Sequence, residues 1–303
     1  MKLGVVFPHD TIEPDAGAIR LYAQEVEAMG FSHILSYDHV IGANRASRPG
    51  WQGYDLDSKF HECMALLSWI AGFTSRIGLA TGVMILPQRQ TVLVARQAAT
   101  LDLLSGGRLR MGVGTGWNPV EYEALGVDFA RRGRIFDEQI DVLRALWSQR
   151  AATFATEFHT ITDAGIWPLP VQRPIPLWLG GGGVHPIKGW AGVERVLRRI
   201  GEKADGWMPT FDPDDTGAEL VAKMHGFARA AGRDPAQVPI EAILLPLKHP
   251  DWTGHVRQWQ ALGAARMVTN ISAPDVVGVD GNLRRLAEIK RAMQDADLWE
   301  EAA

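Results

Sequence analysis

Short apolar runs alternate with amphipathic segments along most of the chain. Eight of these runs have the length and residue types of buried strands, and helical patterns separate them. In order they are "LGVVF", "HILSY", "IGLATGVMIL", "LRMGVGTG", "IPLWLG", "DGWMP", "IEAILLP" and "ARMVTNI". Eight β/α units in 303 residues predict an α/β fold, a (β/α)8 TIM barrel, in preference to a doubly wound sheet.

The helical segments have one apolar face and recognisable ends. Spacings of three and four residues place two sets of side chains on single faces: Ile19, Tyr22, Ala23, Val26 and Met29 in one segment, and Phe136, Ile140, Leu143 and Trp147 in another. Thr91 is the expected N-cap of "TVLVARQAATLDLL", and Gly106 and Gly107 are expected to end that helix. Gly30 ends the first helix in the same way.

Two stretches do not fit a minimal barrel. Residues 40–60, rich in Gly, Arg and Trp, follow a strand, so this insertion is expected at the face where barrel enzymes do chemistry. Residues 151–175 contain "TFATEFHTIT", which predicts a small hairpin before the fifth strand. This second insertion is expected at the far end of the barrel unless it folds over. We therefore predict one domain, residues 1–303, with two insertions.

Charge and hydropathy narrow the class of protein. The net charge of −4 lacks the surplus of Lys and Arg that a nucleic-acid surface needs. The longest nearly apolar stretch, Met64–Phe73, is too short to span a membrane, and "MKLGVVFPHD" has the proline and charge of a first strand, not of a signal sequence. We expect a cytoplasmic protein with neither nucleic acid nor membrane as a partner. The lone cysteine, Cys63, excludes an internal disulfide and is expected to be a buried structural thiol.

In a (β/α)8 barrel the residues just past each strand converge on one mouth, although they are far apart in sequence. Here they are His9, Asp10, Asp38, His39, Thr81–Val83, Trp117, Asn118, Gly180–Gly183, Pro209, Thr210, Lys248, His249, Asn270 and Ser272. The two acid–histidine pairs lack the HxH or HxxxH spacing that would reinforce a metal site, so we predict no metal. The chain has no Gly-x-Ser-x-Gly turn for a nucleophilic serine.

Glycine clusters point instead to an anion. Gly180–Gly183 follows a buried strand, and its backbone N–H groups are free to turn toward a phosphate before the next helix. The alternative is a tight turn without a ligand. "GVGTGW" at 112–117 is a weak dinucleotide signal, because it lacks the third glycine and the later acidic residue of the fingerprint.

Several longer segments carry a resemblance to a known family. They include "EAMGFSHILSYDHV", "TSRIGLATGVMILPQR", "LDLLSGGRL", "GVGTGW", "RGRIFDE", "PIPLWLGGGG" and "ADGWMPT". With these at their spacings, residues 2–210 resemble the bacterial luciferase-like monooxygenase superfamily, in particular its branch that uses the deazaflavin coenzyme F420. The remaining third matches by pattern only.

The resemblance implies a flavin or deazaflavin across the mouth of the barrel. Its phosphate is expected on Gly180, Gly181, Gly182 and Gly183, and its ring near Asp38, with His39 facing the ring as the catalytic residue. Many relatives have a bulge in the third strand with a non-proline cis peptide, which falls here on Thr81, Gly82 and Val83, at the Gly82–Val83 bond. Trp117, also expected at the cofactor, stands where some deazaflavin dehydrogenases have a glutamate proton donor, so that role does not carry over.

Three functions follow as hypotheses. The first is an oxidoreductase that transfers a hydride between F420 and a small organic substrate, with His39 supplying a proton near neutral pH. The second is a monooxygenase that uses O2 and reduced FMN from a partner reductase. The third is a flavin-binding barrel without turnover. In the F420 hypothesis, a separate enzyme supplies the reduced cofactor. Members of the family form homodimers through barrel helices, so we also expect a dimer.

Two further sets of residues bear on these hypotheses. The F420 tail carries glutamates, and the cations available to it at the rim are Arg45, Arg48, Arg89 and Lys188. Trp51, Tyr54 and Trp117 are candidates for an apolar wall beside the substrate, although each is equally suited to packing.

Overall fold

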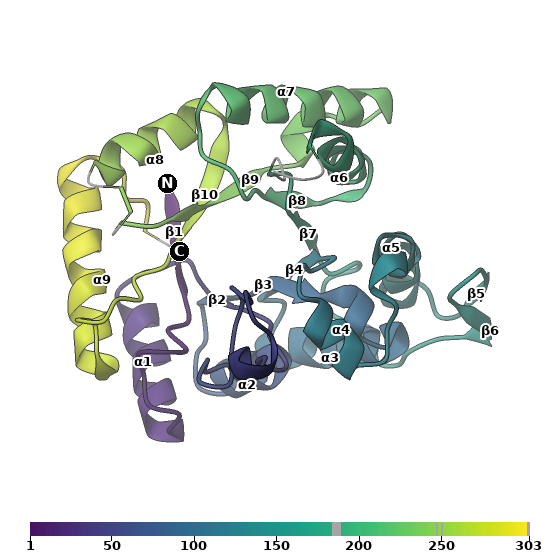
Figure 1. The fold of residues 1–303 in the computed structure, drawn as a ribbon, viewed down its shortest axis with the longest axis horizontal. Helices are drawn as coiled ribbons and strands as arrows, with labels where there is room; N and C mark the ends of the chain where they lie inside the picture. Colours follow the sequence, from purple (N-terminus) through teal and green to yellow (C-terminus); the bar gives the residue numbers. More distant parts are fainter. Residues whose placement is uncertain (184–188, 247, 250, 302–303) are drawn as a thin grey trace.

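The predicted strands form a closed parallel barrel, which confirms the (β/α)8 fold (Figure 1). The structure is a computed structural model that describes residues 1–183, 189–246, 248–249 and 251–301. Around the barrel the strands follow the order of the chain, and the last pairs with the first. They are β1 (Lys2–Val6), β2 (His33–Ser36), β3 (Gly78–Ile85), β4 (Leu109–Gly114), β7 (Leu177–Gly180), β8 (Gly206–Met208), β9 (Ile240–Leu244) and β10 (Ala264–Thr269).

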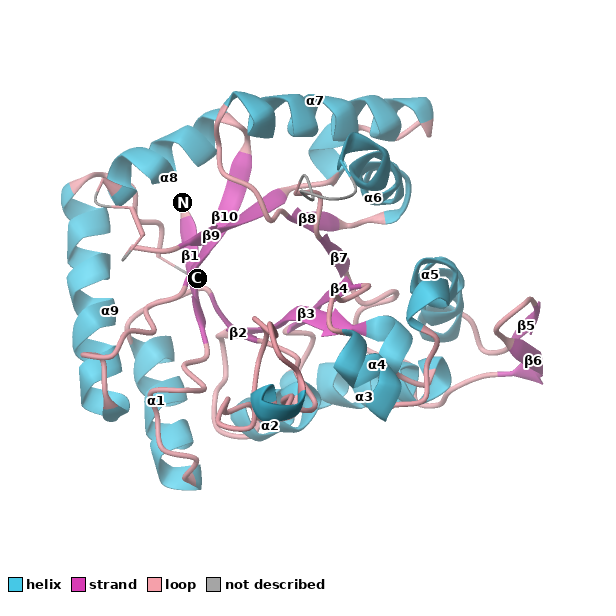
Figure 2. Ribbon diagram, viewed as in Figure 1, coloured by secondary structure: helices cyan, strands magenta, loops and turns pink. Residues whose placement is uncertain are grey.

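Helices surround the ring of strands (Figure 2). They are α1 (Ala16–Ala28), α2 (Cys63–Ala71), α3 (Thr91–Ser105), α4 (Pro119–Ala124), α5 (Arg132–Ser148), α6 (Gly189–Lys203), α7 (Asp215–Ala230), α8 (Trp252–Ala261) and α9 (Gly278–Asp295). Short 3₁₀ helices are η1 (Arg45–Ser47), η2 (Leu86–Gln88), η3 (Phe129–Arg131) and η4 (Pro235–Gln237). Among the residues described, no helix has both the length and the apolar character needed to cross a bilayer.

The predicted helix faces are buried, and one predicted cap is wrong. Helix α1 buries Ile19, Tyr22, Ala23 and Val26, and α5 buries Phe136, Ile140, Leu143 and Trp147. Thr91 is the first residue of α3 and not its N-cap, a position that Gln90 occupies without a side-chain hydrogen bond. The Thr91 hydroxyl has tertiary partners in place of a capping role: it lies 2.6 Å from Nε2 of His159 and accepts a hydrogen bond from Gln139. Gly106, at φ 70°, ends α3 as predicted.

Inside the barrel, glycines on one strand make room for large side chains on the next. A Cβ on Gly4 would lie 2.1 Å from the ring of His33, and one on Gly206 would lie 2.2 Å from the ring of Trp178. Either substitution would displace a large side chain from a closely packed interior. The large side chains beside these glycines therefore fill the barrel interior near the N-terminal ends of the strands.

A buried ion pair crosses this filled interior. The Glu241 carboxylate on β9 lies 2.7 Å from Nη2 of Arg110 on β4, and 3.4 Å from Nε2 of His33. Burial by itself raises the pKa of Glu241, but the Arg110 guanidinium outweighs it and holds that pKa at about 2. Burial also lowers the pKa of His33, so Arg110 is the charged partner of Glu241.

The second insertion forms the predicted hairpin, β5 (Ala152–Ala155) and β6 (Thr160–Ala164), which stands outside α5 (Figure 1). Glu138 of α5 accepts hydrogen bonds from the Phe158 amide and from Nδ1 of His159. His159 also reaches Thr91, which follows the mouth end of β3. The hairpin therefore does fold over, toward the mouth, and its position at the far end is not observed.

Candidate functional site

A cavity of about 630 Å³ opens at the mouth of the barrel, a volume typical of cofactor and substrate sites. Seven residues predicted for the site line it: Asp38, His39, Gly82, Val83, Trp117, Gly180 and Gly181. Thr81, Gly182 and Gly183 do not, and the Thr81 hydroxyl is instead buried in a hydrogen bond to the Gly112 carbonyl. The last third of the chain contributes further lining residues, from Met208 to Val268.

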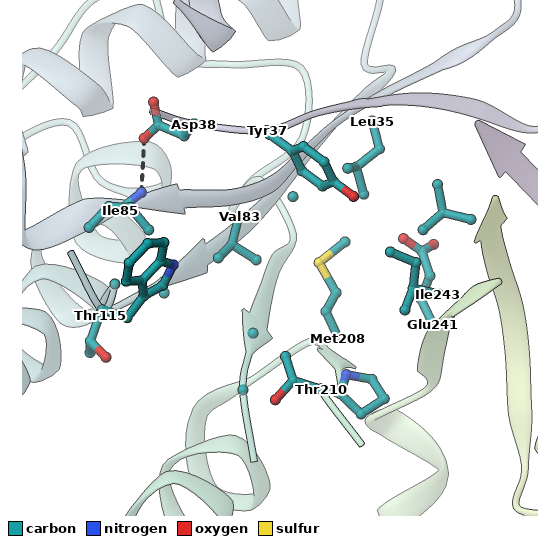
Figure 3. Close-up of a pocket in the computed structure, with 18 of the residues that line it drawn as sticks. Leu35, Tyr37, Asp38, Val83, Ile85, Thr115, Met208, Thr210, Glu241 and Ile243 are labelled. Carbon is teal, nitrogen blue, oxygen red and sulfur yellow. Dashed lines mark hydrogen bonds between the residues drawn. The ribbon is translucent and has the colours of Figure 1, made fainter. Parts of the chain in front are cut away.

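Asp38 braces the wall of the cavity. Its Oδ2 accepts a hydrogen bond of 2.9 Å from the Ile85 amide at the end of β3 (Figure 3), and its Oδ1 accepts one of 2.6 Å from Nη2 of Arg89. Arg89 also lies 2.9 Å from Glu62. Both oxygens of Asp38 and the predicted rim cation Arg89 are thus engaged inside the protein. Asp38 fixes the end of β2 against the end of β3.

His39 lies between the cavity and a buried carboxylate. Its Nδ1 is 2.9 Å from Oε1 of Glu121, a residue of α4 that is 1% exposed. The Val40 amide and the Gln88 side chain also donate to Glu121, at 3.4 and 3.2 Å. Sequence reasoning missed Glu121. The available signal is "NPVE", in which Asn118 caps α4 and Pro119 begins it, so that Glu121 falls in its first turn.

A cluster of three aromatic rings, from Tyr54, Phe60 and Trp117, lies beside the imidazole of His39. The centroid of the imidazole lies 4.0 Å from that of the Tyr54 ring, 4.8 Å from that of Phe60 and 6.3 Å from that of Trp117. Trp51 stacks on Trp117 at 6.0 Å but does not line the cavity. The insertion 40–60 therefore lies at the mouth as predicted, and it supplies Tyr54 to the wall while Trp51 packs behind.

Val83 is wedged against glycines on two neighbouring strands. The Gly82–Val83 peptide is cis, as the resemblance implies. A Cβ on Gly180 would lie 2.7 Å from one Val83 methyl carbon, and one on Gly114 would lie 2.8 Å from the other. Gly116 and Gly181 also line the cavity, so backbone forms part of its surface beside the Val83 side chain.

The four-glycine segment is partly engaged with its neighbours. The Gly181 amide donates to the Met208 carbonyl at 3.0 Å, and the Gly183 amide donates to the Thr210 hydroxyl at 3.2 Å. Gly181 and Gly182 have φ values of 122° and 102°, which favour glycine. Residues 184–188, which include the predicted rim cation Lys188, lie outside the described part of the chain.

Strand residues that the sequence did not single out form the inner part of the cavity. Figure 3 shows Met208 reaching into the space between Tyr37 and Glu241. The Tyr37 hydroxyl accepts a hydrogen bond of 3.1 Å from Asn270, and burial raises its pKa to about 12. Alternation along the strands is the signal for such residues, but it does not say which strand turns a large side chain toward the mouth.

Within the described ranges of the chain, two groups of side chains could supply metal ligands, and both have other partners. The rings of His249 and His255, beside Asp212, stack 4.1 Å apart at 16°, so their in-plane lone pairs do not converge on one ion. Trp259 also donates to Nε2 of His255 at 3.2 Å. The second group is Asp38, Glu62 and Cys63, whose carboxylates bind Arg89; Cys63 is buried, as predicted.

Comparison with known proteins places this barrel among enzymes. An uncharacterized protein of Mycobacterium tuberculosis is 33% identical over 257 residues, covering 82% of this chain and 86% of the relative. The F420-dependent glucose-6-phosphate dehydrogenase of Kineococcus radiotolerans is 31% identical over 244 residues, covering 78% of this chain and 65% of that protein. The solved structure of an F420-dependent secondary alcohol dehydrogenase shares the fold, with a TM-score of 0.74, 17% identity and 99% of each chain covered.

The family match extends over most of the barrel. The luciferase-like monooxygenase family matches residues 1–247, from β1 through β9. All the residues that line the described cavity lie within this range except Val268 on β10. This chain therefore belongs to the luciferase-like monooxygenase family.

Proposed function

We propose that this protein is an oxidoreductase that transfers a hydride between coenzyme F420 and a small organic substrate. The observation that carries the proposal is a single cavity that His39 and Tyr54 line together with Val83, Gly180 and Gly181. The 31% identity to an F420-dependent dehydrogenase favours this cofactor.

The glycine side of the cavity fits a planar ring system. The absence of a Cβ on Gly114 and Gly180 lets the Val83 side chain pack against the backbone of both strands, and a flat group would lie against that Val83 surface in the cavity. The phosphate end would lie at the edge of the four-glycine segment, where the Thr210 hydroxyl also lines the cavity. When bound, F420 supplies or accepts the hydride at its central ring.

The substrate would bind in the part of the cavity next to His39 and the aromatic cluster. An imidazole exchanges a proton near neutral pH, which suits the interconversion of an alcohol and a carbonyl group or the reduction of an unsaturated ketone. Tyr54 and Trp117 line the cavity and would exclude water from the reacting atoms. A separate enzyme would supply the reduced cofactor.

One observation favours FMN as the alternative cofactor. Three of the four predicted rim cations lie in the described part of the chain and already have partners: Arg45 pairs with Asp55, Arg48 with Glu123, and Arg89 with the buried Asp38. FMN ends at its phosphate and needs none of them. The alternative function is a monooxygenase that uses reduced FMN and O2.

Titration with each oxidised cofactor tests the proposal. We expect quenching of F420 fluorescence with a dissociation constant at least tenfold lower than that of FMN, about 1.4 kcal/mol in binding free energy. Tighter binding of FMN would favour the monooxygenase. Binding of F420 with no hydride exchange toward any alcohol or ketone tested would favour a barrel without turnover.

We also propose a homodimer that uses the outer face of α3. Large apolar side chains are exposed there and on the segment that lies against it: Val92, Leu93, Leu104, Trp167 and Val171. Arg96 on α3 donates to the Trp167 carbonyl, which places the two together. Apolar patches of this kind are typical of interfaces.

Leu104→Asp tests this face, because Leu104 is 71% exposed and a buried charge at an interface is unfavourable. Light scattering after gel filtration should give the mass of two chains for the unmodified protein and of one chain for the variant. The matched control is Leu56→Asp, in the 40–60 insertion and 68% exposed, which should stay dimeric. A monomeric parent protein at micromolar concentration would contradict the proposal.

A further inference from the structure

We infer that Glu121 is a positioning residue that holds His39 as a single tautomer, with its proton on Nδ1 and Nε2 free for the substrate. The inference rests on the proposed function for its chemical consequence, but the tautomer itself is a property of the protein without cofactor. It assigns a role to a carboxylate 82 residues away in sequence from the histidine that it holds.

The geometry brings the two residues together from different elements. His39 follows β2, whereas Glu121 lies in the first turn of α4, which begins after β4. Asn118 fixes the start of that helix, since its Oδ1 accepts a hydrogen bond of 3.0 Å from the Val120 amide. Glu121 thereby points at the edge of the imidazole that carries Nδ1, at 2.9 Å.

The remaining partners of Glu121 identify it as an acceptor. The Val40 amide donates to the same oxygen as His39 Nδ1, and the Gln88 amide nitrogen donates to the other. An ionised carboxylate only accepts hydrogen bonds, so Nδ1 must carry the proton in their shared bond. In a neutral imidazole the other nitrogen, Nε2, is then an acceptor.

The opposite edge of the imidazole has no competing partner. Among the described residues none hydrogen-bonds to His39 Nε2, and the ring lines the cavity. Two neighbouring groups are uncharged at neutral pH, because burial, with His61 and His39 itself, lowers the pKa of His9 to about 3, and burial, with the Asp10 carboxylate, raises the pKa of Tyr54. Glu121 is thus the anion in direct contact with the imidazole.

This tautomer fixes what His39 does in each direction of the reaction. When an alcohol is oxidised, neutral Nε2 would accept the O–H proton as the C=O bond forms, and F420, when bound, would accept the C–H hydride. In the reverse direction the protonated ring donates Nε2–H to the carbonyl oxygen as the hydride arrives at carbon. Glu121 stabilises the cationic ring without exchanging a proton with the substrate.

Long-range ¹H–¹⁵N NMR of protein labelled at histidine nitrogen tests the tautomer without any cofactor, with His39→Asn identifying the signals. We expect a protonated Nδ1 and an unprotonated Nε2 above neutral pH. Glu121→Gln retains an acceptor and should keep the tautomer, but losing the anion should make protonation of the ring less favourable. Glu121→Ala should give mixed tautomers or protonated Nε2.

The matched control is Glu123→Gln, since Glu123 lies on the same helix but pairs with Arg48 at the surface. It should leave both the tautomer and the titration of His39 unchanged. Protonated Nε2 in the unmodified protein, or the same tautomer and titration in Glu121→Ala, would overturn the inference. Circular dichroism establishes that each variant is folded.

Kinetics then separate positioning from binding. With F420 and an alcohol probe such as cyclohexanol, Glu121→Gln should lower kcat and move the pH profile, while the dissociation constant of F420 stays unchanged. A raised dissociation constant with unchanged kcat would contradict a role through His39. If F420 does not bind at all, the proposed function fails, but the NMR result still decides the tautomer.

Discussion

Replacing His39 with alanine should lower kcat about 100- to 10,000-fold, the range that one general acid or base contributes, with F420 binding unchanged. His39 lines the cavity and bonds to Glu121, so its loss removes a proton-transferring group and leaves in place the other residues proposed for the cofactor. The assay follows the absorbance of F420 during reduction of cyclohex-2-en-1-one, and fluorescence titration gives the dissociation constant.

The control for this experiment is His225→Ala. His225 lies on α7, outside the barrel, and does not line the cavity, so its removal should change neither quantity. An unchanged kcat in His39→Ala would show that another group moves the proton. Loss of F420 binding together with kcat would instead place His39 in the cofactor site.

Glu241→Ala should lower the free energy of unfolding by about 3–5 kcal/mol, the usual effect of breaking a buried ion pair. The substitution leaves the Arg110 guanidinium buried without its carboxylate, and the nearby charge of Arg266 adds repulsion. Urea unfolding followed by fluorescence and circular dichroism measures the change, with both probes needed to establish a two-state transition.

The same pair predicts a pH dependence with a definite sign. The pKa of Glu241 falls from its ordinary value of 4.5 to about 2 in the folded protein, so the pair contributes its full stability above about pH 5. That contribution is lost as the pH falls toward 2. Glu241→Ala should therefore show a shallower loss of stability over this interval than the unmodified protein.

Replacing both partners distinguishes the ion pair from simple packing. Glu241→Met combined with Arg110→Met removes both charges while keeping side-chain volume, and it should recover most of the lost stability. A double variant as unstable as Glu241→Ala, or a single variant within about 1 kcal/mol of the unmodified protein, would contradict the assigned role.

Much of the fold was predictable because its signals are local. Strand periodicity, the apolar faces of α1 and α5, and the glycine at the end of α3 depend on neighbours a few residues away. Parallel strands deliver the residues after them to one mouth, so His39, Val83 and Gly180 were expected to meet. The conformation of the Gly82–Val83 peptide came from the resemblance and not from any local pattern.

The errors and omissions share a different cause. Thr91 has the residue type of an N-cap, but its hydroxyl is taken by His159 of a hairpin 68 residues away. Arg89 has the position of a rim cation, but Asp38 draws it inward. In each case the choice between a solvent-facing role and a buried partner depends on side chains that the fold brings near.

The sequence by itself determined the barrel, the two insertions and seven of the ten residues expected at the cavity, because periodicity and turn chemistry act over short distances along the chain. Only the tertiary structure decided how the polar groups pair: Glu121 with His39, Arg110 with Glu241, and the hairpin with α5 and α3. The physical reason is that a buried charge or hydrogen-bonding group takes whichever partner the packed interior places within about 3 Å.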